Sequence, residues 1–254
     1  MKHLLPSTAP ARWSALVRWS AFTGATLASA AAAALVVPTV LAAAARPAAA
    51  QVPNAGPSAP RALYVAACES CHGTDGRGNP RIDAPVLAGL SAAHLERQLD
   101  GFRRGYRGLH PEDVEGREMR PMVDELAPAD VAAVAVWLAS LSAPRPVGGE
   151  ATTGGVAQAG GEAGGRDPAR GQRLYAACAV CHGRSGEGND ALGAPRLAGQ
   201  ASWYTARQLR KFIDGVRGSH PDDTSGAAMR DSVADLAPGD AADIVAWIET
   251  LPAN

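Results

Sequence analysis

The sequence predicts an all-α protein with two tandem helical domains joined by a flexible glycine-rich linker. Residues 68–142 align with residues 178–252 without a gap, and 33 of the 75 positions are identical. A long unit that occurs only twice indicates two compact domains rather than a solenoid array. Apolar residues recur at helical spacing in both copies, and no useful stretch alternates like a strand. We expect domain 1 at residues 58–143, the linker at 144–166 and domain 2 at 167–254.

Residues 1–50 are expected to direct export. They contain four Lys and Arg residues and no acid, and an apolar stretch runs from Ala21 to Ala45. The alanines before Gln51 form a small-residue cleavage site, which is typical of a secretory signal peptide. Because the apolar stretch is long for a signal peptide, a retained N-terminal membrane anchor stays open as the alternative. Both alternatives place the domains in the periplasm or at the outer face of the cytoplasmic membrane.

The charge of the exported chain excludes one class of partner. Without residues 1–50, Lys plus Arg falls from 24 to 20 while Asp plus Glu stays at 25. Lys211 is then the only lysine, and no basic tract remains. We therefore expect no nucleic-acid partner.

The segment between the repeats has the composition of a tether. Eight glycines lie between Ser142 and Asp167, and Ala, Thr and Pro fill much of the rest. Such a composition cannot bury a core. The tether either only joins the domains or lets them reorient.

Each repeat carries the pattern Cys-x-x-Cys-His, at residues 68–72 and 178–182. This is the spacing for covalent haem attachment. Both thiols lie on one turn and can form thioethers to the two vinyl groups of one porphyrin, and the histidine then lies under the iron. A single copy could also be a redox dithiol or half of a zinc site, but two copies that use every cysteine predict two haem c groups. The predicted attachment residues are Cys68, Cys71, Cys178 and Cys181, and the predicted proximal ligands are His72 and His182.

The first helix of each repeat leads into this motif. It carries Leu63 and Tyr64 in domain 1, and Leu174 and Tyr175 in domain 2. These pairs are offset by one residue relative to their cysteines. We therefore expect the chain to approach the motif slightly differently in the two domains.

A middle and a last helix follow in each repeat. Apolar residues at helical spacing predict the middle helix over residues 91–107, with its twin over residues 202–217. The last helix is predicted to begin at Pro128 in domain 1 and near Pro238 in domain 2. Proline is favoured in the first turn of a helix, and an acid follows each proline.

The repeat also selects a ligand for the sixth position of each iron. Only three methionines lie beyond residue 1: Met119, Met122 and Met229. Met119 aligns with Met229, whereas Met122 aligns with Ser232. In both copies 47 positions separate the proximal histidine from the aligned methionine. The sequence therefore predicts Met119 and Met229 as ligands and leaves Met122 as the alternative in domain 1.

The two repeats contain three further histidines, His94, His110 and His220. His110 and His220 are repeated, and each precedes a proline. They are either distal ligands of a bis-histidine site or loop residues. His94 aligns with Tyr204, so it is not part of a repeated site, and we expect it at the surface.

Two prolines are candidates for orienting the proximal imidazoles. Pro85 and Pro195 each lie 13 residues beyond the proximal histidine. A metal-bound histidine usually donates its other ring N–H to a carbonyl or a carboxylate. We therefore expect the Pro85 and Pro195 carbonyls to accept this hydrogen bond; the alternative is a plain turn.

The middle helices repeat an Arg-Gln pair, Arg97-Gln98 and Arg207-Gln208. These side chains either contact the haem propionates or form a solvated face.

Together these motifs resemble the dihaem class I c-type cytochromes, and the cytochrome c4 family in particular. The shared pieces are the Cys-x-x-Cys-His-Gly motif, the Gly-x-Gly-Asn after it, Ala-Pro-x-Leu-Ala-Gly, Arg-Gln-Leu, His-Pro, the repeated Met and the terminal Trp helix. They extend over about 190 of the 254 residues. The resemblance implies two cytochrome folds with one His/Met-ligated low-spin haem each. The long glycine-rich linker departs from the family and argues against its usual tight domain–domain interface.

The resemblance also implies a function and partners. It implies single-electron transfer outside the cytoplasm, with a quinol-oxidising bc complex as donor and a haem-copper oxidase as acceptor. An alternative is a membrane-attached cytochrome subunit of a larger dehydrogenase or terminal oxidase. A third is an enzyme such as a dihaem peroxidase, which needs an open or unusual ligand position. Two matched methionines argue against the enzyme, so we predict an electron carrier.

Overall fold

The computed structural model describes residues 59–144 and 166–253, and these two parts belong to one compact unit of the chain. Residues 1–50, predicted as a signal peptide or anchor, and most of the predicted linker lie outside the described residues. The described residues form helices, 3-10 turns and loops, with two isolated β-bridges, Asn79–Ala84 and Asn189–Ala194. The all-α prediction is confirmed.

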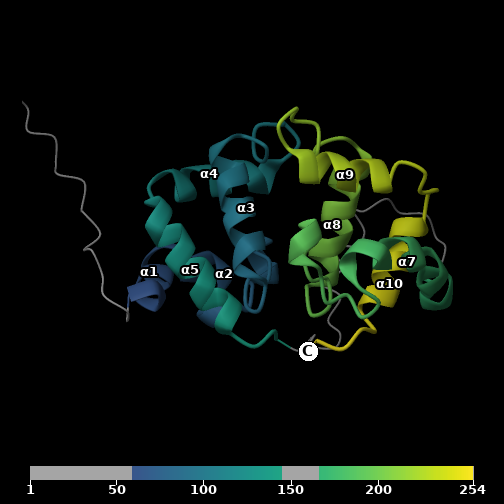
Figure 1. Ribbon diagram of the computed structural model, residues 1–254, viewed down its shortest axis with the longest axis horizontal. Coiled ribbons are helices and arrows are strands. Elements are labelled where there is room, and N and C mark those ends of the chain that lie inside the picture. The colour runs from purple at the N-terminus through teal and green to yellow at the C-terminus, as the bar shows by residue number, and fades with distance from the viewer. Residues whose placement is uncertain (1–58, 145–165, 254) are drawn as a thin grey trace, which may run out of the picture. The chain divides into compact units, whose positions relative to one another are not determined.

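Each domain is built from a first, a middle and a last helix that share one core, with a further helix before the last (Figure 1). Within each domain the last helix packs against the first and the middle helix. In domain 1 the helices are α1 (Ala59–Ala67), α2 (Glu69–His72), α3 (Ala92–Arg103), α4 (Val114–Asp124) and α5 (Pro128–Ser140). In domain 2 they are α7 (Pro168–His182), α8 (Ser202–Ile213), α9 (Thr224–Ser232) and α10 (Asp240–Ile248).

The core residues come from the predicted apolar faces. In domain 1, Tyr64, Leu95 and Leu138 are buried in one cluster, and the Tyr64 ring lies 5.0 Å from that of Trp137. The matching cluster in domain 2 holds Tyr175, Leu209, Phe212, Ile244 and Ile248.

The middle helices are shorter than predicted. α3 ends at Arg103 and α8 at Ile213, each four residues before its expected end. Gly105 (φ 78°) and Gly215 (φ 71°) follow in a left-handed conformation, which stops a helix at low steric cost. The chain can therefore turn back over the core after each middle helix.

The helices that carry the methionines were not predicted. α4 contains Met119 and α9 contains Met229. Gly116 and Pro121 lower the helix propensity of α4, and its apolar residues lack a clear period. Asp113 and Asp223 at the two N-caps were the available signal.

The first helices absorb the one-residue offset in different ways. Domain 1 has a break at Cys68 (φ −125°, ψ −34°) between α1 and α2, whereas α7 runs unbroken through its motif. Both tyrosines nevertheless reach the same place. Tyr64 Oη donates to the carbonyl of Gly73 at 2.6 Å, and Tyr175 Oη donates to that of Gly183 at 2.9 Å.

The two domains contact each other directly. The Gln200 side chain pairs with the backbone of Val86, accepting from its N–H at 3.1 Å and donating to its carbonyl at 2.9 Å. Lys211 of α8 reaches Asp113 at the start of α4. The close domain–domain contact that the linker argued against is therefore present in the structure.

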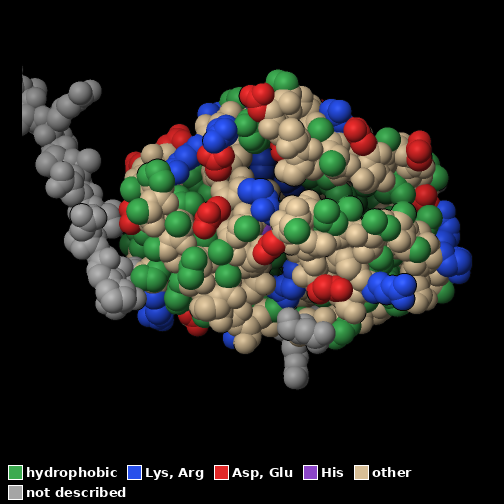
Figure 2. All heavy atoms as spheres, viewed as in Figure 1, with side chains coloured by type: hydrophobic (Ala, Val, Ile, Leu, Met, Phe, Trp, Pro, Cys, Tyr) green, Lys and Arg blue, Asp and Glu red, His purple; other side chains and the backbone are tan. Residues whose placement is uncertain are grey.

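The described surface is mixed in charge. Figure 2 shows acidic and basic side chains interspersed over the visible face. Within residues 59–144 and 166–253, no helix has the length and apolar character needed to cross a membrane.

Candidate haem sites

Each histidine predicted as a proximal ligand is buried and held by one ring nitrogen. His72 ends α2, and its Nδ1 lies 3.1 Å from the carbonyl oxygen of Pro85. His182 ends α7, and its Nδ1 lies 2.8 Å from that of Pro195. A carbonyl can only accept, so Nδ1 carries the proton and donates. Nε2 is therefore the ring nitrogen that can bind a metal in both domains.

A glycine allows the proline loop to approach the histidine. Gly78 N donates to the carbonyl of His72 at 2.7 Å. Its φ is +81°, and a Cβ there would lie 3.0 Å from the carbonyl oxygen of Ala84. Gly188, with φ +85°, repeats this contact to His182 at 2.8 Å. Only glycine fits such a conformation at such a short distance without strain.

The protonation state of His72 and His182 suits metal binding. Burial lowers the pKa of His72 and of His182, and the bond to the proline carbonyl opposes this only in part. Both imidazoles are therefore neutral near pH 7, as metal binding requires.

The structure describes all four cysteines of the chain and pairs none of them in a disulfide. Cys71 and Cys181 are exposed, while Cys68 and Cys178 are half-buried. Burial raises the pKa of Cys68 to about 11 and also raises the pKa of Cys178. Redox dithiols depend on a lowered thiol pKa, so these thiols do not suit the redox alternative.

The aligned methionines lie on matching helices. Met119 and Met229 are half-buried on α4 and α9. Met229 packs against the same core cluster as Cys178, so α9 and the end of α7 face one core. Met122, the alternative in domain 1, is 47% exposed.

The repeated histidines are engaged by their own loops. Nδ1 of His110 accepts from the backbone N–H of Glu112, and Nδ1 of His220 accepts from that of Asp222, both at 3.2 Å. The His220 ring also stacks on Tyr106, with centroids 4.6 Å apart. These contacts favour the loop role over the bis-histidine alternative.

Two arginines with buried Nε atoms test whether the protein fits haem. Arg107 stacks on Phe102 and Arg217 stacks on Phe212, at 4.2 and 4.4 Å from the ring centroids. Both donate to Gln98 Oε1, at 3.0 and 3.1 Å. Their Nε atoms are buried and have no acceptor among the described residues. Buried N–H groups are nearly always hydrogen-bonded, and a carboxylate is a strong acceptor for a guanidinium. The haem propionates are carboxylates, so these residues fit the group.

The sequence singled out other arginines. Arg207 pairs with Asp83 and Glu115, at 2.9 and 2.8 Å, so it does not form a solvated face. Arg107 and Arg217 were missed, although they are identical at the repeat shift and each lies just before a repeated glycine. That identity was the signal that could have found them.

The expectation that His94 lies at the surface is wrong. Its Nδ1 is buried without a partner in the described part of the chain. Burial and the charges of Arg217, Arg97 and Arg107 lower the pKa of His94 to about 3. The reason is that α3 lies at the domain contact, which a repeat alignment cannot reveal.

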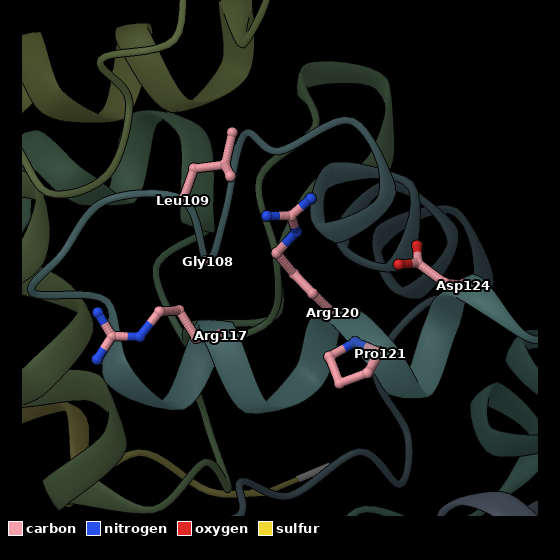
Figure 3. Close-up of a pocket in the computed structure, with 6 residues that line it drawn as sticks. All are labelled: Gly108, Leu109, Arg117, Arg120, Pro121 and Asp124. Carbon is pink, nitrogen blue, oxygen red and sulfur yellow. The ribbon is translucent and has the colours of Figure 1, made fainter.

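Domain 1 also has a surface hollow of about 430 Å³ along α4 (Figure 3). Arg120 points from α4 toward Leu109 on the preceding segment. The lining residues are Gly108, Leu109, Arg117, Arg120, Pro121 and Asp124. This set contains no histidine, cysteine or serine.

Comparison with known proteins defines the class. The profile of the cytochrome c family matches residues 59–142 and 168–252, one match for each domain. The chain thus belongs to the cytochrome c family and is a tandem member with two haem c groups, which confirms the predicted cofactors.

Individual relatives define the class of this chain more closely. Cytochrome c4 of Stutzerimonas stutzeri is 32% identical over 201 residues, which cover 74% of this chain and 85% of the relative. A thiosulfate dehydrogenase electron acceptor of Stutzerimonas stutzeri strain A1501 is 34% identical over 168 residues, 65% of this chain and 71% of the relative. The crystal structure of reduced recombinant cytochrome c4 from Pseudomonas stutzeri has a TM-score of 0.56 and 29% identity, covering 77% of this chain and 98% of that chain. The chain is a dihaem, cytochrome c4-like electron carrier.

Proposed function

We propose that each domain binds its haem iron between an imidazole and a thioether. The pairs are His72 with Met119 and His182 with Met229. The observation that carries this proposal is the repeated geometry: both imidazoles donate through Nδ1, and both methionines lie on the helix before the last one. The haem supplies one-electron oxidation and reduction when it is bound.

The chain's own residues tune and protect that chemistry. The carbonyls of Pro85 and Pro195 hold the imidazole orientation and raise its basicity. A methionine ligand raises the reduction potential relative to a second histidine. With a protein ligand on each side, no open position is left for substrate, which suits electron transfer.

The carrier is proposed to work outside the cytoplasm, with residues 1–50 as a signal peptide or anchor. The family resemblance supports a quinol-oxidising bc complex as donor and a haem-copper oxidase as acceptor. One relative is named a thiosulfate dehydrogenase electron acceptor, which supports a dehydrogenase as another donor.

Optical spectra of three methionine variants test the ligand set. Met119→Ala and Met229→Ala should each remove about half of the near-infrared sulfur-to-iron band of the oxidised protein. Met122→Ala is the matched control and should leave the band intact. If Met122→Ala halves the band and Met119→Ala does not, the ligand proposed for domain 1 is wrong.

A second candidate is a cytochrome subunit attached to a larger dehydrogenase. The apolar stretch within residues 1–50 and the dehydrogenase-linked relative favour it. Purification of the haem-loaded full chain from its native membranes distinguishes the two. A catalytic subunit that co-purifies in constant proportion supports the subunit, whereas a chain released alone supports the carrier.

A further inference from the structure

The two domains meet through an ion cluster that exists on one side only. Arg207 of α8 pairs with Asp83 and Glu115 of domain 1. Glu115 also accepts from Lys211, at 2.5 Å. The guanidinium of Arg207 is thus neutralised by acids from the other domain.

The repeat alignment allows the two sides of the domain contact to be compared. Arg97 of α3 occupies the position that matches Arg207, but Gly193 and Ser225 stand where the twin side has Asp83 and Glu115. The Arg97 guanidinium reaches that loop, since its Cζ would lie 3.8 Å from a Cβ built on Gly193. Arg97 Nη2 is buried with no hydrogen-bond partner in the described ranges. Arg97 is therefore present without the two acidic partners that Arg207 has on the other side.

A second nitrogen without a partner lies one helical turn away, and it can donate when it carries the ring proton. His94 of α3 has a buried Nδ1 without a partner among residues 59–144 and 166–253. Burial lowers the pKa of His94, and the nearby charges of Arg217, Arg97 and Arg107 lower it further. The acid closest to Gly193 in the facing loop sequence is Asp190, and its carboxylate accepts a hydrogen bond from Ser91 Oγ. Among the described residues, no salt bridge joins Asp190 to Arg97.

We propose that Arg97 and His94 form an oxyanion-binding site at the domain contact, on the side where Gly193 and Ser225 replace the acids. A buried guanidinium is stable when a carboxylate or a phosphate accepts its N–H groups. The oxyanion comes either from solution or from a haem propionate, and both present the same chemistry. The site makes the surroundings of the two haems unequal, and it does not depend on the iron ligands proposed above.

The test compares variants of the haem-loaded full chain. Arg97→Gln removes the site. Gly193→Asp fills it with a carboxylate, and this change is tolerated by the backbone because Asp83 at the twin position has φ 57° while Gly193 has φ 70°. Arg173→Gln removes one charge from an exposed position of α7 and is the matched control. The unfolding midpoint is measured against inorganic phosphate at constant ionic strength, and both reduction potentials are measured by redox titration.

Each outcome decides the proposal. With a solution anion, phosphate raises the midpoint of the wild type and of Arg173→Gln but not of Arg97→Gln or Gly193→Asp. With a propionate, phosphate changes no midpoint, but Arg97→Gln and Gly193→Asp lower one potential and leave the other unchanged. If both site variants match Arg173→Gln in both measurements, the site does not exist. Should Arg97→Gln not fold, Gly193→Asp carries the test alone.

Discussion

The ammonium nitrogen of Lys211 lies 2.6 Å from Oδ1 of Asp113, with side chains only 9% and 1% exposed. Lys211 is the only lysine beyond the first 50 residues, and it joins α8 of one domain to the start of α4 in the other. Asp113 also accepts from the backbone N–H of Gly108 at 2.7 Å. The helix that carries Met119 is therefore anchored partly by the neighbouring domain.

Replacement of Lys211 should test this anchor. Lys211→Met leaves the Asp113 carboxylate buried without its counter-charge, which costs about 3 kcal/mol of folding free energy. Urea unfolding of the haem-loaded protein measures the loss. Asp113→Asn added to Lys211→Met should recover most of it. The control is Arg210→Met, because the Arg210–Asp214 pair is half-exposed and its loss should cost less than about 1 kcal/mol. Equal losses in Lys211→Met and Arg210→Met would show that the buried pair does not form in solution.

The same cluster predicts acid sensitivity. Burial pushes the pKa values of Asp113 and Glu115 up, but the hydrogen bond from Lys211 and the nearby positive charges outweigh it, so both pKa values are lowered. Unfolded carboxyl groups titrate near pH 4. The stabilisation is thus complete above about pH 4 and is lost as the pH falls through the lowered folded values. The unfolding midpoint should drop steeply there in the wild type and less steeply in Lys211→Met. Parallel curves would refute the assignment.

The hydroxyls of Tyr64 and Tyr175 should contribute equally to stability, although the two tyrosines are offset by one residue relative to their cysteines. Tyr64→Phe and Tyr175→Phe each remove one of two donors to a carbonyl in the turn directly after the haem motif. The other donor, the backbone N–H of Gly76 or Gly186, remains. We therefore expect each substitution to cost about 1 kcal/mol, measured by denaturant unfolding of the holoprotein. Tyr204→Phe is the control, since its hydroxyl makes no hydrogen bond to the described residues. A loss in only one domain would mean that the break at Cys68 changes the role of Tyr64.

Two helical glycines should respond in opposite ways to alanine. A Cβ on Gly171 would meet the backbone of Asp243, so Gly171→Ala pushes α7 away from α10 and should cost about 1–3 kcal/mol. A Cβ on Gly101 would have its nearest neighbour at 3.8 Å, on Tyr106. Gly101→Ala should therefore stabilise the protein by up to about 1 kcal/mol through helix propensity. Thermal unfolding of the two variants measures both effects, and a change of the same sign would contradict the packing.

Much of the site could be predicted because its signals are local or repeated. The Cys-x-x-Cys-His spacing lies on one helical turn, and the identity of the copies singled out Met119 over Met122. The carbonyls of Pro85 and Pro195 were also within reach, because they follow the histidines at one fixed spacing. The methionine ligands themselves remain a proposal.

The unpredicted residues lie where one copy meets the other. His94 has no repeated partner, and Arg107 and Arg217 lack a motif that names their task. Their burial follows from a contact between segments about a hundred positions apart, such as Gln200 with Val86.

By itself the sequence determined the two helical domains and the cofactor class, and it predicted the attachment residues, because covalent haem chemistry requires particular atoms at a short chain spacing. Only the tertiary structure decided which charges are paired across the domain contact and which are left without an acceptor. Burial and electrostatic pairing depend on distances through space, and residues such as Asp113 and Lys211 carry no mark of each other along the chain.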